Sequence, residues 1–179
     1  MTQEEMNLLV QDGIRSSVEN VCGMMLGCDV VVGESRQIAH PMQETDGVVA
    51  LIGMAGPWIG TGALSCKPQL ACKLAGAMLM TEFEKVDEEV LDAIAELANM
   101  VIGNLKTVVE EKVGAMGLST PTTIYGASFM TKIGGSNHWT LIPVQVAEGE
   151  LQVQICMLPN HEGRTHHRLD IVGHMVTRS

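Results

Sequence analysis

The sequence predicts an α+β fold, with helices packed on a largely antiparallel β-sheet in a single domain. The 179 residues match the length of one ordinary domain, and no stretch rich in Pro, Gly or Ser divides them. Two pairs of strand-like segments are each joined by a tight turn, which is typical of hairpins with antiparallel strands. Segments with helical periodicity stand before and between these pairs, which favours helices packed on a sheet.

Three segments have the residue spacing of helices. In the first, apolar residues recur every three or four positions from Met6 to Leu26. Pro68 opens the second, because proline is well placed in a first helical turn, where its missing N–H is not needed. The third is the longest and follows an acidic stretch. The expected helices are residues 3–26, 69–80 and about 87–115.

Six segments resemble β-strands, and two of the connections between them are tight turns. Ala55–Gly56–Pro57 joins the first hairpin and Ala147–Glu148–Gly149 joins the second. The C-terminal residues have weak periodicity, so we expect the domain to span 1–158 and 159–179 to be a short extra element or a loose tail. The expected strands are 28–34, 48–54, 58–66, 122–126, 138–146 and 150–158.

Composition and charge exclude several classes of function. The formal charge of −10 would repel nucleic acid and anionic membranes, so neither is an expected partner. No apolar stretch is long enough to span a bilayer, and acids stand near the N-terminus where a secretory signal has bases. We therefore expect a cytoplasmic protein.

Neither cysteine nor histidine forms a familiar metal pattern. The five cysteines are odd in number and have no C-x-x-C spacing, so we expect them to be buried small apolar side chains. Three histidines of the tail, His166, His167 and His174, have no cysteine nearby to complete a zinc spacing, and adjacent histidines point to different sides. No metal site is expected.

The longest helix has two distinct faces. Apolar residues recur along it in steps of three or four and predict a stripe buried against the sheet. That stripe consists of Val90/Leu91, Ile94, Leu97/Ala98, Val101, Leu105 and Val108. A polar stripe with the same steps, which we call the ridge, lies opposite. The ridge consists of Glu89, Asp92, Glu96, Asn99, Gly103, Lys106 and Glu110.

Two residues of the ridge are unusual for a face that is merely solvated. Asn99 is a mediocre helix former, and Gly103 costs about 1 kcal/mol relative to Ala while letting another backbone come close. Both suggest a docking surface centred on the carboxylate of Glu96 and the amide of Asn99. A plain solvated face is the alternative, since E-x-x-N is a weak motif that occurs again at Glu4–Asn7.

The acidic run 81–92 also has two interpretations. Acids at the N-terminal end of a helix complement the helix dipole. The same acids could steer a basic partner toward the domain. The sequence alone leaves both interpretations open.

The sequence around the ridge resembles a known protein family. The runs DEEVLDAIAELANMVIGNLKT (87–107) and GLSTPTTIYG (117–126) resemble the CheC/CheX/FliY family of chemotaxis phosphatases, as do VVALIGMAGPWIGTGALS and AGAML upstream. The family signature is matched by Asp92, Glu96, Asn99 and Pro121, with a gap before the proline about one residue shorter than usual. A single signature is most similar to CheX, and that resemblance implies a homodimer.

The resemblance implies an activity and its site. The expected substrate is a phosphorylated response regulator of the CheY type, whose own Mg²⁺ and lysine hold its aspartyl-phosphate, so no cofactor of this chain is implied. Asn99 would hold a water in line for attack and Glu96 would pair with the regulator's lysine. Asp92, Gly103 and Lys106 are expected to contact the partner. A non-catalytic docking module for a response regulator or a flagellar or sensory protein is the main alternative, and a scaffold with no partner at the ridge is the third.

Overall fold

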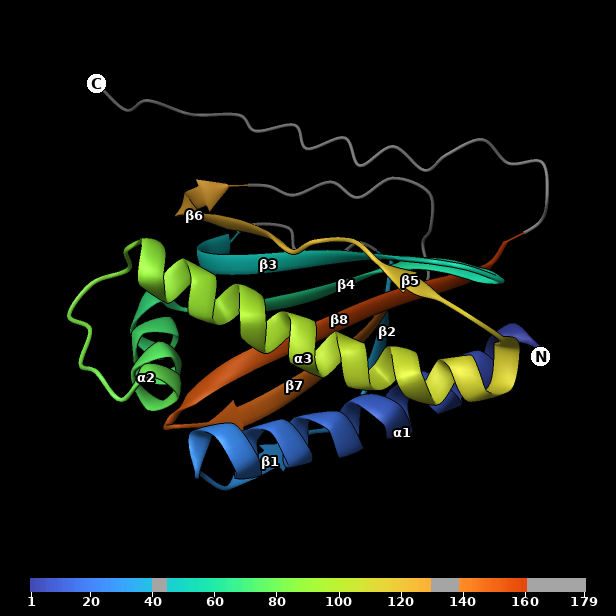
Figure 1. Ribbon diagram of the computed structural model, residues 1–179, viewed down its shortest axis with the longest axis horizontal. Helices are drawn as coiled ribbons and strands as arrows, with labels where there is room; N and C mark the ends of the chain where they lie inside the picture. Colours follow the sequence, from blue (N-terminus) through green and yellow to red (C-terminus); the bar gives the residue numbers. More distant parts are fainter. Residues whose placement is uncertain (40–44, 130–138, 161–179) are drawn as a thin grey trace.

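Three α-helices, a π-helical turn and eight strands make up the part of the chain that the structure describes. The computed structural model describes residues 1–39, 45–129 and 139–160 (Figure 1). The helices are α1 (Gln3–Val21), α2 (Pro68–Leu79) and α3 (Glu88–Val113), with the π turn at Cys22–Leu26. The strands are β1 (Val30–Val32), β2 (Arg36–Ile38), β3 (Thr45–Ala55), β4 (Trp58–Cys66), β5 (Gly117–Leu118), β6 (Thr122–Phe129), β7 (Trp139–Val146) and β8 (Gly149–Pro159).

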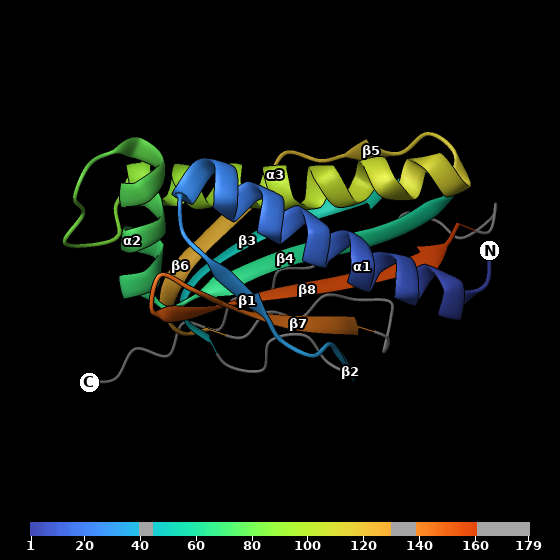
Figure 2. The ribbon, with the colours of Figure 1, turned by 90° about the horizontal axis from the view of Figure 1, so that it is seen from below.

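The strands form one antiparallel sheet. Their order is β1-β7-β8-β4-β3-β5, with β2 also paired to β7 and β6 also paired to β3. Every pairing among the described strands is antiparallel. The helices cover one face of this sheet, with α1 and α3 side by side and α2 at one end (Figure 2). The predicted α+β fold is therefore confirmed.

Both predicted hairpins are present. Strands β3 and β4 pair from Val48 with Cys66 to Met54 with Gly60. Strands β7 and β8 are joined by Ala147 and Glu148, which both have positive φ, 48° and 63°, as the right-handed twist of a two-residue hairpin requires. Lys73 of α2 pairs with the Glu148 carboxylate at 2.9 Å and so links this turn to the helical layer.

Helix α1 is fixed at its start and along its length. The Thr2 hydroxyl accepts from the Glu5 N–H while the Glu5 carboxylate accepts from the Thr2 N–H, which is a capping box. Further along, Gly13 packs against α3, where an added Cβ would lie only 2.8 Å from the Leu105 Cδ1 atom. The absence of a side chain at Gly13 therefore lets the two helices approach closely.

The main core lies between the helices and the sheet and is almost wholly aliphatic. Met6, Ile14 and Val18 of α1 meet α3 and the sheet there with essentially no exposed surface. A second, smaller cluster on the opposite face of the sheet consists of Val49, Leu51 and Ala63, with Ile124 against it. None of the helices in the described residues is long and apolar enough to cross a bilayer.

The observed elements differ from the expected ones mainly at their ends. The first helix was expected to reach residue 26, but regular α-helix ends at Val21 and the π turn follows. Strands β2 and β5, of three and two residues, were not predicted. Strand β8 extends to Pro159, and Asn160 hydrogen-bonds to the backbone of Gly56 and Pro57. The proposed tail and its histidines otherwise fall in 161–179, outside the described residues.

Candidate active site on the longest helix

Helix α3 positions the ridge by burying its opposite face. Its first turn is capped by Asp87, whose carboxylate accepts from the Val90 N–H at 3.0 Å. The buried residues are Val90, Ala93, Ile94, Leu97, Ala98, Val101, Ile102, Leu105 and Val109. The predicted stripe is thus confirmed except at its end, where Val109 is buried and Val108 is only half-buried, and at Leu91, which is also half-buried. The drift follows from 3.6 residues per turn.

The ridge is not uniformly solvent-facing, which corrects the sequence interpretation. Asp92 and Glu96 are exposed, as predicted. Asn99, Gly103 and Lys106 are instead half-buried. The chain that follows α3 returns beside this helix through β5 and β6 (Figure 1), and Leu118 of β5 lies near Gly103. The two central residues therefore differ: the side chain of Glu96 is exposed, whereas Asn99 is half-buried.

The returning chain is held firmly against the sheet. Ser119 forms a pair of hydrogen bonds with Gly53 of β3: its N–H donates to the Gly53 carbonyl at 2.9 Å, and its hydroxyl oxygen accepts from the Gly53 N–H at 2.9 Å. The same hydroxyl donates to the carbonyl of Thr120. Pro121, the last residue of the signature, comes directly after this anchor and is half-buried where β6 begins. This segment forms a fixed flank beside the ridge.

Lys106 has a structural partner of its own. Its ammonium pairs with Glu110 Oε2 at 2.8 Å, and Glu110 Oε1 accepts from the Met116 N–H at 2.8 Å. Hydrogen bonds from Lys106 and from the Met116 backbone lower the pKa of the Glu110 carboxyl. This bridge ties the end of α3 to the returning chain, so Lys106 serves the fold whatever it also does in docking.

Gly103 leaves open space rather than a tight contact. A Cβ built there would lie 3.9 Å from Leu118 Cδ1, which is an ordinary van der Waals distance. The sequence analysis suggested that another backbone comes close at Gly103. The described part of this chain supplies no such backbone. Its role in contacting a partner stays a prediction.

The central side chains have no partner within the described residues. Asp92, Glu96 and Asn99 make no hydrogen bond or ion pair there. The arrangement is a carboxylate and an amide one turn apart on the same face, both available to another molecule. An amide can donate to or accept from a water, and a carboxylate can accept from a lysine.

The described residues show no second cluster of reactive side chains. Cys22 and Cys66 are buried, and burial raises the pKa of their thiols to about 11 and about 12, so they stay protonated and unreactive at neutral pH. The prediction of buried apolar cysteines is confirmed except at Cys28, which is half-buried. Within the described ranges, no three His, Cys, Asp or Glu side chains are grouped so that they could hold a metal ion.

The sequence missed two features close to the site. One is the fixed flank formed around Ser119, whose hydroxyl gave no signal because its partner lies far away in the chain. The other is a groove beside the start of α3, lined in part by Tyr125 of β6. The single tyrosine of the chain, in a strand-like segment next to the signature, was the available signal.

Comparison with known proteins shows the family to which the chain belongs. The model of the family "Chemotaxis phosphatase CheX" matches residues 48–143, which is more than half of the chain. A relative from Thermotoga maritima named "CheY-P phosphatase CheX" is 27% identical over 131 residues, covering 73% of this chain and 84% of the relative.

Solved structures share the fold. A CheC-like superfamily protein from Shewanella has a TM-score of 0.76 at 25% identity, covering 85% of this chain and 99% of that one. A CheX–CheY–BeF₃–Mg²⁺ complex from Borrelia burgdorferi matches with a TM-score of 0.66 at 21% identity, covering 84% of this chain and 96% of that one. The chain belongs to the chemotaxis phosphatase CheX family.

Proposed function

We propose that this protein hydrolyses the aspartyl-phosphate of a CheY-type response regulator, using Glu96 and Asn99 of α3. Family membership supports this, as do the name of the Thermotoga relative and the Borrelia relative solved with CheY. The observation that carries the proposal is the pairing of an exposed Glu96 with a half-buried Asn99 one turn later. Neither side chain is engaged within the described residues.

The reaction needs geometry more than covalent help from the protein. The oxygen of a water attacks phosphorus in line with the bond to the aspartyl oxygen, and that bond breaks. The electron pair leaves with the aspartate carboxylate, one proton of the water passes to the solvent, and the other stays on the inorganic phosphate that forms. Phosphoryl transfer of this kind depends mainly on positioning and on stabilising charge.

Asn99 suits the task of placing the water. Its amide is neutral, so it can contact a water beside the phosphoryl group without repelling the phosphate oxygens. Its half-buried position restricts the directions that the amide can take. A side chain held in this way loses less entropy when it is ordered in the complex. The rate gain then comes from orienting the water, which is a large effect in well-positioned reactions.

Glu96 suits the task of fixing the register of docking. It is exposed and has no partner in the described part of the chain, so its carboxylate is available to a lysine of the receiver. A charge-assisted hydrogen bond of this kind contributes roughly 1.5–3 kcal/mol. The receiver's own Mg²⁺ neutralises charge on the phosphoryl group, and the receiver rather than this chain supplies its ligands.

The test is the lifetime of a phosphorylated CheY-type receiver with Mg²⁺. Wild-type protein at substoichiometric amounts should shorten the lifetime, and Asn99→Ala should abolish that effect while still binding the receiver. Asn7→Ala is the matched control, because Asn7 belongs to the other E-x-x-N sequence, on α1, and is also half-buried. Binding by wild-type protein without turnover would instead favour the docking module.

Two further expectations accompany this proposal. A homodimer is expected from the family resemblance, and sedimentation equilibrium of the full chain tests it. A cytoplasmic location is expected because the proposed partner is a cytoplasmic signalling protein, and fractionation of cells tests that expectation.

A further inference from the structure

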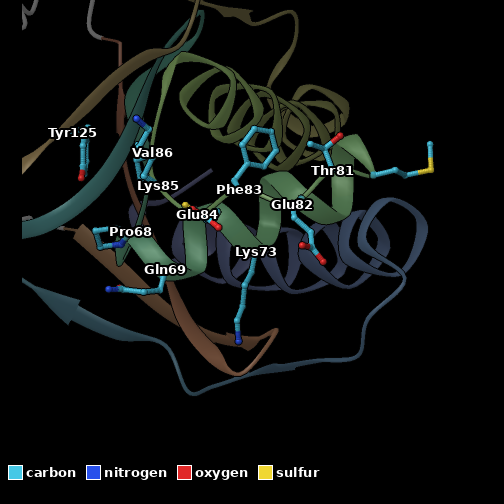
Figure 3. A pocket seen from close by; sticks show the side chains of 13 residues that line it. Pro68, Gln69, Lys73, Thr81, Glu82, Phe83, Glu84, Lys85, Val86 and Tyr125 are labelled. Carbon is cyan, nitrogen blue, oxygen red and sulfur yellow. The ribbon is translucent and has the colours of Figure 1, made fainter.

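An open groove lies beside the N-terminal end of α3. It has a volume of about 770 Å³ and is lined by α2, by segment 80–86 and by Tyr125 of β6. Figure 3 shows Phe83 and Glu84 over α2, with Lys73 pointing away toward the β7–β8 turn. Phe83 and Val86 are partly buried against the core and form an apolar floor.

Met80, at the rim of this groove, occupies a position that stability does not favour. The N–H of Thr81 donates to the carbonyl of Gly76 at 3.2 Å, which closes α2 in a Schellman motif with Met80 at the left-handed position. Glycine or asparagine usually stands there, because a side chain at φ 53° is strained. Met80 is also 93% exposed, so its apolar side chain gains nothing from burial.

Tyr125 places the groove on the same side of the sheet as the ridge. It pairs with Val48 of β3, whose side chain lies in the core beneath the helices, and residues paired in this way share a face. Tyr125 is 50% exposed on that face, and its strand packs beside α3. Aromatic and methionine side chains of this kind are common anchors in protein interfaces.

The distance from the groove to the ridge is short. Asp87, the cap of α3, directly follows the segment that lines the groove, and Glu96 comes nine residues later. Nine residues of helix span about 14 Å. A standard protein interface buries about 800 Å² on each partner, more than the exposed part of one helical ridge offers. A partner centred on Glu96 and Asn99 therefore reaches beyond the ridge.

The surface between the two features is strongly acidic. Residues 81–92 contain one base, Lys85, and their exposed acids make no ion pair within the described part of the chain. Those acids are Glu82, Glu84, Asp87, Glu88, Glu89 and Asp92. Lysine or arginine side chains on a partner would complement this path, and an apolar side chain would complement the groove at its end.

We infer that the receiver's contact continues from the ridge along this acidic path into the groove, where apolar side chains of the receiver contact Tyr125 at the end near Pro68 and Met80 at the end where α2 stops. This inference rests on the proposed function and extends its site. The groove serves affinity and choice of receiver, whereas Asn99 serves the chemical step. Changes in the groove should therefore raise KM and leave kcat unaltered.

The test compares Met80→Asn with Leu8→Gln. Asparagine tolerates the left-handed position, so Met80→Asn should fold at least as stably as wild type while removing the exposed apolar side chain. Leu8 is an apolar side chain, 58% exposed, on the first turns of α1 at the other end of the helical layer, and serves as the matched control. Tyr125→Thr gives a second variant that suits a strand.

The measurements are KM and kcat for the phosphorylated receiver and Kd for the receiver carrying beryllofluoride and Mg²⁺. Met80→Asn and Tyr125→Thr should each raise KM and Kd about tenfold with kcat within twofold of wild type, and Leu8→Gln should change neither. Unchanged KM and Kd in both groove variants, with wild-type turnover intact, would overturn the inference and leave the proposed function standing. A change of oligomeric state in Met80→Asn without a change in Kd would assign the groove to a second copy of the chain instead. Absence of both binding and turnover by wild type would overturn both proposals.

Discussion

The carboxylate of Glu110 accepts a hydrogen bond of 2.8 Å from the backbone N–H of Met116, across the point where the chain leaves α3. The same carboxylate pairs with Lys106 one turn earlier. Together these contacts hold the start of the returning chain close to the C-terminal end of the ridge.

The Glu110 bridge should make stability depend on pH. Its partners lower the pKa of this carboxyl in the folded protein, so the stabilisation is present above the carboxyl's ordinary value of 4.5 and is lost as pH falls through the lowered value. Glu110→Gln should therefore lower Tm at pH 7, and the difference from wild type should shrink as pH falls below about 4.5. Thermal unfolding followed by circular dichroism at pH 7 and pH 3.5 measures this. A difference that stays constant with pH would contradict the assigned cause.

A buried hydroxyl fixes how α1 lies against α3. Ser17 donates to the carbonyl of Val101 at 2.9 Å in the helix–helix contact. Ser17→Ala should lower the free energy of unfolding by about 1 kcal/mol, because the hydrogen bond is lost and no charged group is left unpaired. Ser16→Ala is the control, since Ser16 is the exposed neighbour on the same helix and its replacement should be neutral or slightly stabilising. Urea unfolding of both variants measures their free energies of unfolding. Equal losses of stability in Ser17→Ala and Ser16→Ala would argue against a stabilising role of this hydrogen bond.

The elements that the sequence predicted correctly are those whose own residue pattern determines their structure. Both hairpins were predicted because alternating residues flank a short turn, and the helices because their apolar residues repeat at helical spacing. Strands β2 and β5 were missed because they are short segments whose pairing is set by β7 and β3, not by their own residues. A sequence pattern has no access to such distant partners.

The candidate site was predicted in its residues but not in its surroundings. The spacing of Glu96 and Asn99 follows from helix geometry alone, whereas the half-burial of Asn99 and the anchor between Ser119 and Gly53 depend on how distant parts of the chain pack. The groove was missed for a different reason. Met80 stands where glycine usually ends a helix, so the local rule gave no warning of the Schellman turn that shapes the groove.

Replacing Gly103 should affect the stability of the protein and its binding to the receiver in different ways. Gly103→Ala should raise the free energy of unfolding by about 1 kcal/mol, because alanine is the better helix former and, among the described residues, its methyl group would meet only Leu118 at an ordinary distance. If the open space is used by the receiver, the same variant should raise KM for the phosphorylated receiver. Asn104→Ala is the control, since this exposed residue lies off the ridge and should gain helix stability without any change in KM. Equal KM values for wild type and Gly103→Ala would remove Gly103 from the docking surface.

Glu96 should govern docking through its charge. Glu96→Gln removes a charge-assisted hydrogen bond to the receiver's lysine, which is worth roughly 1.5–3 kcal/mol, so Kd for the beryllofluoride-bearing receiver should rise roughly 10- to 100-fold. Glu96→Lys should weaken binding further, because two like charges would then meet. Glu111→Gln is the matched control: Glu111 is an exposed glutamate of the same helix that lies off the ridge.

The salt dependence of binding separates a direct contact of Glu96 from a general effect of net charge. Glu96→Gln and Glu111→Gln change the net charge equally, so long-range attraction to the receiver falls by a similar amount in both and is screened alike by salt. Only the direct contact distinguishes them, and it should persist at 0.5 M salt. Equal Kd values for the two variants would show that Glu96 acts only through the overall acidity of the surface.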